Sequence, residues 1–260
     1  MTAALDVLAI GAHPDDAELG CGGTLALLAQ AGRRVGLLHL TAGEAGSRGT
    51  AKGRRREAES AGAALGAIEL AFLDCGDGDL RHGTAEEDAL IAELRRLRPE
   101  LVLGPTPADR HPDHGRAHRL VADACFYAGL RRRGSGKPHR PAAVFSYMQN
   151  DPFAPSFIVD VSTAWAAKEQ ALDAYESQLH QPRTTEPGPG WATAPATTQV
   201  PVAPAPAAAT KVSSPEFRLA VAGRAQHFGL VIGAAYGEPF WSPLPLAVAD
   251  PLALLPRGLR

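Results

Sequence analysis

The sequence predicts an α/β fold, Rossmann-like, in which a mainly parallel sheet carries helices on both faces. Short apolar segments alternate along the chain with longer segments that have the apolar spacing of helices, and this alternation is typical of βαβ units. The chain of 260 residues is 45% hydrophobic and 21% charged, as in globular proteins that bury a sizeable core. We therefore expect a single domain over residues 1–260.

The first half of the chain is expected to supply four strands and four helices. Each strand is a short apolar run, and the first, LDVLAIG, ends where a polar loop begins. Gly32 ends the first helix, and the second helix is rich in Ala, Glu and Arg. The expected strands span residues 5–11, 34–40, 68–73 and 101–104, and the expected helices span residues 24–31, 54–65, 85–97 and 111–130.

The second half continues this pattern and is then interrupted. Residues 182–215 hold eight prolines and few charges. Because such a composition buries too little surface to offset its ordering entropy, we expect an extended insertion or, alternatively, a lid over the site. Helical spacing resumes at 216–228, where Arg224 could line the site, and the Pro-rich tail after Tyr236 is expected to pack on the surface. The other expected elements are strands at 142–148 and 157–161 and a helix at 163–179.

Composition and charge disfavour several classes of function. The formal net charge of −2 gives no reason to expect a nucleic-acid partner. The three cysteines are widely spaced and form neither a disulfide framework nor a CxxC metal site, which suits a reducing compartment. The first ten residues lack the basic segment of a signal peptide, and no apolar run approaches the ~20 residues that span a bilayer. We expect a cytoplasmic protein without membrane contact.

Two histidine-containing loops carry the chemistry. His13-Pro14-Asp15-Asp16 follows the first expected strand, and His111-Pro112-Asp113-His114 follows the fourth. Because ligands of open α/β sheets bind outside the carboxyl ends of the strands, both loops are expected at one edge of the sheet. The topology therefore predicts that they form a single site.

The residue types of these loops fit a catalytic metal. A catalytic zinc ion takes three protein ligands and keeps one position open, and one His and one Asp of the first loop with one His of the second meet that number. The remaining carboxylate could accept a proton from water, and the remaining histidine could stabilise an oxyanion and protonate a leaving amine. The spacing alone leaves open whether Asp15 or Asp16 is the ligand, and the ligand set accepts Zn2+ or Fe2+.

The segments AHPDDAELGCGGTLA, at 12–26, and DRHPDHGRAHRLV, at 109–121, resemble the LmbE-like (PIG-L) family of metal-dependent N-acetylglucosaminide deacetylases. Within that family the chain is similar to the bacillithiol-biosynthesis deacetylases, which act on N-acetylglucosaminyl-malate. This narrower resemblance rests on LTAGEAGSRGT at 40–50, KPHRPAAVFSYMQN at 137–150 and YGEPF at 236–240. It implies the LmbE-like fold, an amino-sugar substrate, and a homo-oligomer such as the hexamers common in this branch.

The resemblance also implies roles for individual residues of the two loops. His13, Asp16 and His114 correspond to the zinc ligands of the family. Asp15 corresponds to the general base, and His111 to the electrostatic stabiliser and general acid. In this mechanism, water activated by zinc attacks the acetamide carbonyl, and protonation of the nitrogen releases acetate and a free amine.

Further residues are expected around this centre. By resemblance, Asp113 would orient His111 through a hydrogen bond, and Arg54 would bind substrate, such as the carboxylates of malate. Tyr147 and Gln149 follow a strand at the same sheet edge and are candidates for substrate contact. The mycothiol-pathway relatives place a tyrosine where this chain has Asp109, which disfavours their substrate and leaves open what assists His111.

Other functions remain to be weighed against deacetylation of N-acetylglucosaminyl-malate. The same chemistry could act on another N-acetyl sugar, such as diacetylchitobiose, or on the amide of a thiol conjugate. Gly20, Gly22 and Gly23 suggest a Rossmann-type nucleotide-binding protein, but no G-x-G-x-x-G stands at the turn from strand to helix. A metal-binding protein without catalysis is disfavoured because Asp15 and His111 are both present.

Overall fold

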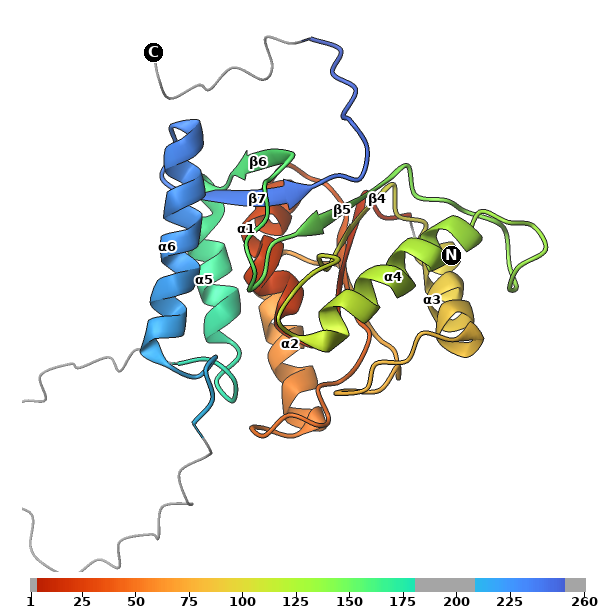
Figure 1. Ribbon diagram of the computed structural model, residues 1–260, viewed down its shortest axis with the longest axis horizontal. Helices are drawn as coiled ribbons and strands as arrows, with labels where there is room; N and C mark the ends of the chain where they lie inside the picture. Colours follow the sequence, from red (N-terminus) through yellow and green to blue (C-terminus); the bar gives the residue numbers. More distant parts are fainter. Residues whose placement is uncertain (1–3, 181–208, 251–260) are drawn as a thin grey trace, which may run out of the picture.

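The computed structural model describes residues 4–180 and 209–250. Its centre is a seven-stranded sheet in the order β3-β2-β1-β4-β5-β7-β6, in which the first five strands of that order run parallel and β7 is antiparallel to both neighbours. This arrangement confirms the predicted α/β class with a mainly parallel sheet (Figure 1). The strands are β1 Val7–Gly11, β2 Val35–His39, β3 Glu69–Phe72, β4 Leu101–Gly104, β5 Ala143–Tyr147, β6 Phe157–Asp160 and β7 Gly237–Trp241.

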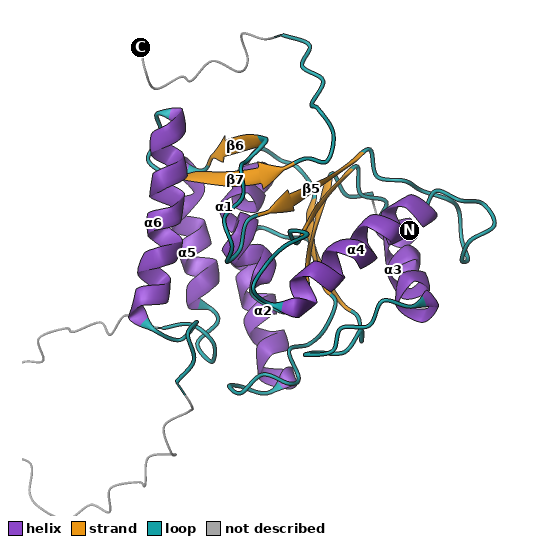
Figure 2. Ribbon diagram, in the orientation of Figure 1, coloured by secondary structure: helices purple, strands orange, loops and turns teal. Residues whose placement is uncertain are grey.

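The helices cover both faces of the sheet (Figure 2). Side chains of β1 alternate between two buried apolar clusters: Val7 and Ala9 belong to the cluster with α1, α2 and α5, and Leu8 and Ile10 to the cluster with α3 and α4. Period-two alternation of strand side chains produces this division. The helices are α1 Asp16–Gln30, α2 Ala51–Leu65, α3 Thr84–Leu97, α4 Pro112–Tyr127, α5 Trp165–Asp173 and α6 Pro215–Ile232, with a 3-10 turn η1 at Ser162–Ala164.

Three expectations about the elements were wrong. The tail after Tyr236 does not simply pack on the surface, because β7 inserts between β5 and β6 and buries Phe240 completely. The first helix begins at Asp16 rather than 24, since its glycines allow close packing: a Cβ on Gly20 would lie 2.1 Å from Tyr147 Cδ2. The helix expected at 163–179 ends at Asp173 and continues as a turn.

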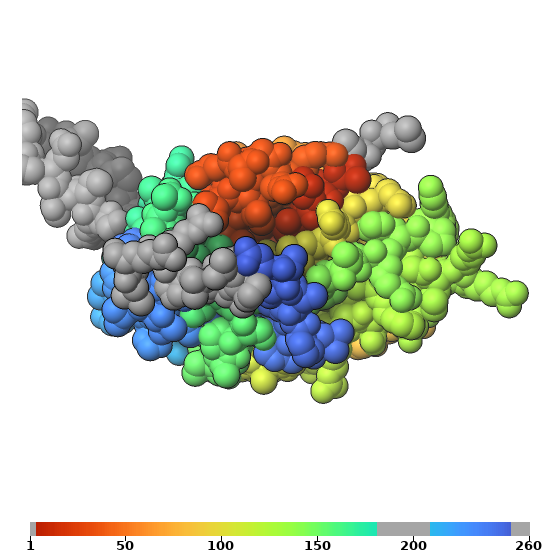
Figure 3. All heavy atoms as spheres, turned by 90° about the horizontal axis from the view of Figure 1, so that it is seen from above, coloured from red at the N-terminus to blue at the C-terminus, as the bar shows by residue number. Residues whose placement is uncertain are grey.

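The C-terminal elements close the fold around the N-terminal ones. In the space-filling view, the blue C-terminal part of the described chain lies between red and orange N-terminal segments and green segments from the middle of the sequence (Figure 3). Most of the expected insertion, 182–208, lies outside the described residues. Its end is ordered as the start of α6: the Ser214 hydroxyl accepts a hydrogen bond from the Phe217 amide, 3.1 Å away.

Within the described ranges, no helix combines the length and apolar character that crossing a membrane requires.

Candidate metal centre and active site

The first loop places its side chains through an unusual backbone. Asp15, the N-cap of α1, has φ 100° and ψ −23°, a left-handed conformation that non-glycine residues rarely adopt. The His13 amide donates a hydrogen bond to Asp16 Oδ2 over 2.8 Å, so the carboxylate also closes the loop on itself. This hydrogen bond helps to hold the strained backbone of the loop. The backbone in turn points the carboxylates of Asp15 and Asp16 in different directions.

The second loop is the beginning of α4. His111 is its N-cap, and His111 Nδ1 accepts a hydrogen bond from the Asp113 amide at 3.3 Å. Pro112 occupies the first helical position, where a backbone N–H would have no partner within the helix in any case. Because Nδ1 is an acceptor, the proton of neutral His111 belongs on Nε2. The second histidine of the motif, His114, follows within the first turn.

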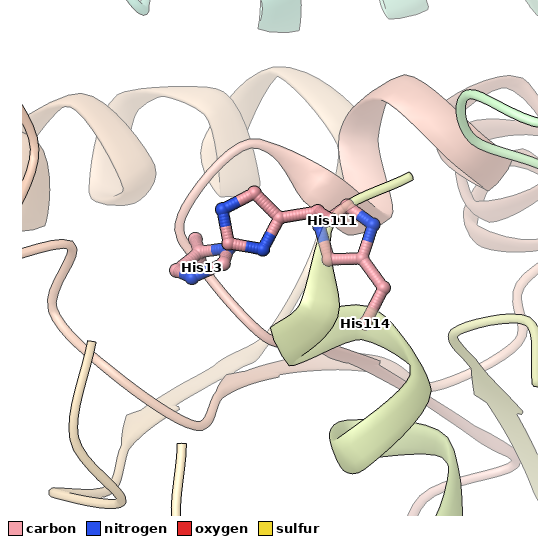
Figure 4. Close-up of side chains that lie close together, drawn as sticks. All are labelled: His13, His111 and His114. Atoms are coloured by element: carbon pink, nitrogen blue, oxygen red, sulfur yellow. The ribbon is translucent and has the colours of Figure 1, made fainter. Parts of the chain in front are cut away.

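The sheet brings the two loops together, as the topology predicted. His13 lies 4.8 Å from His111 and 5.7 Å from His114 between ring centroids, and the last two rings stack at 4.9 Å (Figure 4). One nitrogen of each ring lies within 4.8 Å of the others, so the three histidines form a group that could hold a metal ion.

Asp16 joins this group through both of its carboxylate oxygens. Its Oδ2 lies 3.4 Å from His13 Nδ1, and its Oδ1 lies 3.3 Å from His114 Nε2. Ligand atoms bound tetrahedrally at about 2.1 Å from zinc are about 3.4 Å apart, so these spacings suit a shared cation. The structure therefore brings together the three expected ligands and places His111 beside them, while the division of roles between ligands and catalytic groups stays a prediction.

Carboxylates face the outer nitrogens of both expected histidine ligands. His13 Nε2 lies 3.1 Å from Asp77 Oδ1 and 3.3 Å from Asp113 Oδ2, and His114 Nδ1 lies 2.9 Å from Asp109 Oδ1. Such partners fix the orientation and tautomer of a metal-binding imidazole. Asp77 was missed by the sequence reasoning, although it follows β3 at the same sheet edge and the same topological rule could have found it.

The expected role of Asp113 needs correction. Its carboxylate does not bond the His111 ring but accepts hydrogen bonds from the amides of Gly78, at 2.8 Å, and Leu80, at 3.1 Å, and faces His13. The reason is geometric: the Asp113 side chain leaves the first turn of α4 toward the loop after β3, and only its backbone amide turns back to His111.

Asp109, which precedes the second loop, orients His114 through the contact of its Oδ1 with His114 Nδ1. It also accepts hydrogen bonds from the amides of His111, at 3.0 Å, and Asn150, at 2.9 Å. Burial alone would raise the pKa of the Asp109 carboxyl, but the hydrogen bonds from His114 and the two amides hold that pKa below its ordinary value. Asp109 is thus an ionised anchor for the second loop.

Asp15 has the environment of a proton acceptor. Burial raises the pKa of its carboxyl to about 7, against the opposing charge of Arg54, whose Nη2 lies 3.6 Å from Asp15 Oδ2. A cation bound beside Asp15 would lower this pKa, as nearby positive charge favours the carboxylate. A carboxylate with a pKa near the working pH is suited to general base catalysis.

Arg54 lines the cavity but is largely occupied by the protein. Its Nη2 donates to the Pro14 carbonyl over 2.6 Å and its Nη1 to the Gly43 carbonyl over 3.2 Å, while its buried Nε has no hydrogen-bond partner among the described residues. Gly43 has φ +70° and passes so close that a Cβ there would lie 1.8 Å from Arg54 Nη1. Arg54 therefore holds the first loop, and its expected contact with substrate stays a prediction.

A cavity of about 260 Å³ opens over these groups. Gln149 lines it and donates from Nε2 to Asp16 Oδ1 over 2.5 Å, so it could reach substrate as expected.

Tyr147 could not reach substrate, because it is fully buried beneath α1 and its hydroxyl donates to the Ile10 carbonyl over 2.8 Å. The expectation for Tyr147 was wrong because its side chain points from β5 into the core. Other lining residues include Leu19, Asp77, Arg110, Asn150, Gln178, Val212, Phe217, Val221 and Arg224.

The wall formed by α6 was the hardest part to foresee. Arg224, expected as a lining residue, does line the cavity and bonds the Gln149 carbonyl. Val212, near the end of the proline-rich segment, and Phe217 and Val221, on α6, were missed because they carry no chemical signature in the sequence. Only the folded arrangement shows that these apolar side chains face the metal-binding loops.

Comparison with known proteins identifies the family of this chain. A family model described as PIG-L, GlcNAc-PI de-N-acetylase, matches residues 8–125. Diacetylchitobiose deacetylase of Thermococcus kodakarensis is 34% identical over 189 residues, covering 66% of this chain and 70% of that protein. The 1D-myo-inositol 2-acetamido-2-deoxy-alpha-D-glucopyranoside deacetylase of Kineococcus radiotolerans is 32% identical over 186 residues, covering 55% and 52%. The crystal structure of the conserved protein TT1542 from Thermus thermophilus superposes with a TM-score of 0.79 at 38% identity, covering 95% of this chain and 98% of that one. The chain belongs to the PIG-L family of LmbE-like deacetylases.

Proposed function

We propose that this protein is a metal-dependent hydrolase that removes the acetyl group from an N-acetylglucosaminide, with N-acetylglucosaminyl-malate of bacillithiol biosynthesis as its substrate. The observation that carries the reaction type is the close approach of Asp16 to His13, at 3.4 Å, and to His114, at 3.3 Å, with Asp15 and His111 on the same cavity. Family membership supports deacetylation. The cytoplasmic location and the homo-oligomer implied by the resemblance stay predictions.

The donor set fits a divalent cation. Two imidazole nitrogens and a carboxylate, each oriented by hydrogen bonds to other groups, match the usual protein ligands of a catalytic zinc or ferrous ion. Zn2+ held there would lower the pKa of water and polarise the amide carbonyl. His13, Asp16 and His114 would hold the ion, and Asp77, Asp109 and Asp113 would orient the two histidines.

The remaining groups would move the protons. Asp15 accepts a proton from the attacking water through its carboxylate, which Arg54 holds in place from 3.6 Å. His111 would enter this step as the imidazolium. Its Nε2–H faces the oxyanion that develops on the acetamide carbonyl and is then transferred to the leaving nitrogen, so His111 ends the step neutral while Asp15 keeps the proton taken from water. Burial lowers the pKa of His111, which makes its imidazolium a stronger proton donor.

An anionic aglycone is supported by Arg110. This exposed arginine lines the cavity next to His111, and no ion pair or hydrogen bond engages its guanidinium within the described parts of the chain. A free guanidinium is well suited to a carboxylate, and malate carries two. Arg110 is therefore better placed than Arg54 to select N-acetylglucosaminyl-malate.

Diacetylchitobiose is the second candidate substrate. The relative from Thermococcus kodakarensis supports it, as does the apolar wall of Val212, Phe217 and Val221. An aromatic ring beside a polar site can pack against the apolar face of a second sugar unit. A neutral disaccharide would use this wall and would not need Arg110.

Acetate release from N-acetylglucosaminyl-malate, diacetylchitobiose and free N-acetylglucosamine would decide between these substrates. We expect the malate conjugate to have the highest kcat/KM and the Arg110→Gln variant to lose that preference by about 10-fold or more, as loss of a charged hydrogen bond implies. Arg119→Gln, which removes an exposed arginine of α4, is the matched control and should keep the preference. Equal losses on all three substrates would rule out Arg110 as an anion site, and no acetate from any of them would rule out the proposed function.

A further inference from the structure

The helix that carries the metal-binding loop is broken just behind the site. In α1, Cys21 has φ −142° and ψ 19°, which is not helical. The break separates the first turn, with Asp16, from the rest of the helix. Backbone groups on either side of a break lose their i to i−4 partners and need others.

Glu238, the second residue of β7, satisfies the backbone groups on the far side of the break. Its Oε1 accepts a hydrogen bond from the Gly23 amide at 2.9 Å, and its Oε2 accepts from the Thr24 amide and hydroxyl, each at 2.7 Å. The carboxylate thus acts as an N-cap for the second segment of α1, although it comes from the other end of the chain. Gly23 permits this approach, because a Cβ there would lie 2.9 Å from Val161 Cβ and 3.1 Å from Glu238 Oε1.

Lys168, from α5, satisfies the near side. Its Nζ donates to the Leu19 carbonyl over 2.9 Å and to Glu238 Oε1 over 2.5 Å, and Arg224 donates to the same Leu19 carbonyl over 3.2 Å. The side chains of Lys168 and Glu238 are each only 2% exposed. A fully buried ion pair therefore bridges the two sides of the break.

We propose that the Lys168–Glu238 pair is a positioning clamp, which keeps α1 broken and so aims its first turn at the metal centre. The connection to the site is short: the Leu19 amide donates to the Asp15 carbonyl over 2.8 Å, and Asp16 opens the same turn. Without the clamp, the Gly23 amide would recover its helical partner, the Leu19 carbonyl, by straightening the helix. The first turn, with the carboxylates of Asp15 and Asp16, would then be displaced.

A Lys168–Glu238 pair that only stabilised the fold would affect unfolding but not the position of the metal centre. Removing one charge leaves the other buried and destabilises the fold, whereas replacing both with apolar groups of similar size is often neutral. The double variant K168M/E238M therefore removes the clamp without leaving either member of the pair as an unpaired buried charge. The double variant K168M/E238Q is its matched partner, because glutamine keeps an oxygen that can accept from Gly23 or Thr24.

The experiment compares both double variants with wild type and with Arg95→Met. Arg95 is also buried and donates to the carbonyls of Ala128 and Leu130, but it joins α3 to the end of α4, away from α1. The measurements are Zn2+ affinity by competition with a chelating dye, kcat and KM on the fastest substrate of the panel, and Tm. This inference rests on the metal site of the proposed function.

We expect K168M/E238M to bind Zn2+ about 10- to 100-fold more weakly, as for other residues that orient ligands, and to lose about 100-fold in kcat with a smaller change in KM. K168M/E238Q should recover part of both losses, and Arg95→Met should lower Tm without either loss. The clamp would be overturned if K168M/E238M kept the kcat and Zn2+ affinity of wild type. It would also be overturned if Arg95→Met lost as much kcat and Zn2+ affinity as K168M/E238M does.

A crystal structure of K168M/E238M separates the clamp from the proposed function. Helical φ and ψ at Cys21 in the variant would support the clamp, whatever the wild type catalyses. A wild type that neither bound Zn2+ nor released acetate would reject the hydrolase but not the clamp. An unchanged break at Cys21 would overturn the clamp whatever the wild type catalyses.

Discussion

Asp109 Oδ1 lies 2.9 Å from His114 Nδ1, so the residue that precedes the second loop fixes the ring of an expected metal ligand. The same carboxylate caps the His111 amide and holds the Asn150 amide beside the cavity. Asp109 therefore orients an expected ligand and anchors the second loop at the same time.

The first prediction concerns this contact. We expect Asp109→Asn to weaken Zn2+ binding by about 10- to 100-fold, because the amide no longer holds His114 with its proton on Nδ1 and its Nε2 free for the metal. Isothermal titration of the metal-free variants measures the change. Glu59→Gln, which alters an exposed carboxylate on α2, is the control, and equal affinity in both variants would contradict the assigned role.

The second prediction separates the two adjacent aspartates. Asp15→Asn should lower kcat by about 10²- to 10⁴-fold, the usual contribution of a general base, while zinc content stays at the wild-type level. Asparagine is the suitable replacement because it tolerates the left-handed backbone at this position. Asp16→Asn should instead lose the metal. Metal analysis beside kinetics checks both, and an Asp15→Asn protein without zinc would make Asp15 a ligand.

A third prediction follows from a buried carboxyl beneath the site. Glu18 is fully buried, and burial raises its pKa from 4.5 to about 7 despite the hydrogen bond from the Tyr175 hydroxyl at 2.7 Å. Because the folded protein holds this proton more tightly than the unfolded chain, protonated Glu18 contributes stability below pH 4.5 that is lost as the pH rises toward 7.

The Glu18→Gln variant removes this dependence. In metal-free protein, the free energy of unfolding of wild type should fall relative to Glu18→Gln between pH 4.5 and 7, and urea unfolding at several pH values measures it. Glu59→Gln, on the exposed side of α2, should show no such trend. A constant difference between wild type and Glu18→Gln across this range would mean that Glu18 titrates normally.

The sequence was sufficient to predict the parallel core and the meeting of the two loops. Both follow from local signals, namely short apolar runs followed by polar loops, combined with the rule that the carboxyl ends of parallel strands share an edge. His13 and His114 lie far apart in the chain, yet β1 and β4 are neighbours in the sheet, so their loops had to be close.

The features that could not be predicted depend on long-range pairing or on side-chain direction. Nothing local in GEPFW marks β7 as a strand between β5 and β6, since Pro239 argues against it. The glycines of α1 indicated a loop by propensity, whereas packing against Tyr147 and Val161 requires them inside a helix. Similarly, the family resemblance implied a hydrogen bond from Asp113 to His111 that the orientation of the Asp113 side chain does not make.

The last prediction tests the corrected position of Tyr147. Tyr147→Phe keeps the ring packed under Gly20 and removes only the hydroxyl that donates to the Ile10 carbonyl. We expect a loss of about 1 kcal/mol in the free energy of unfolding, the typical net contribution of one buried hydrogen bond, with kcat and KM unchanged because the hydroxyl does not reach the cavity. Gln149→Leu provides the contrast, since Gln149 lines the cavity and bonds Asp16. It should alter KM or kcat while leaving the core packed. A rise in KM for Tyr147→Phe, without a change in stability, would return this tyrosine to the substrate site.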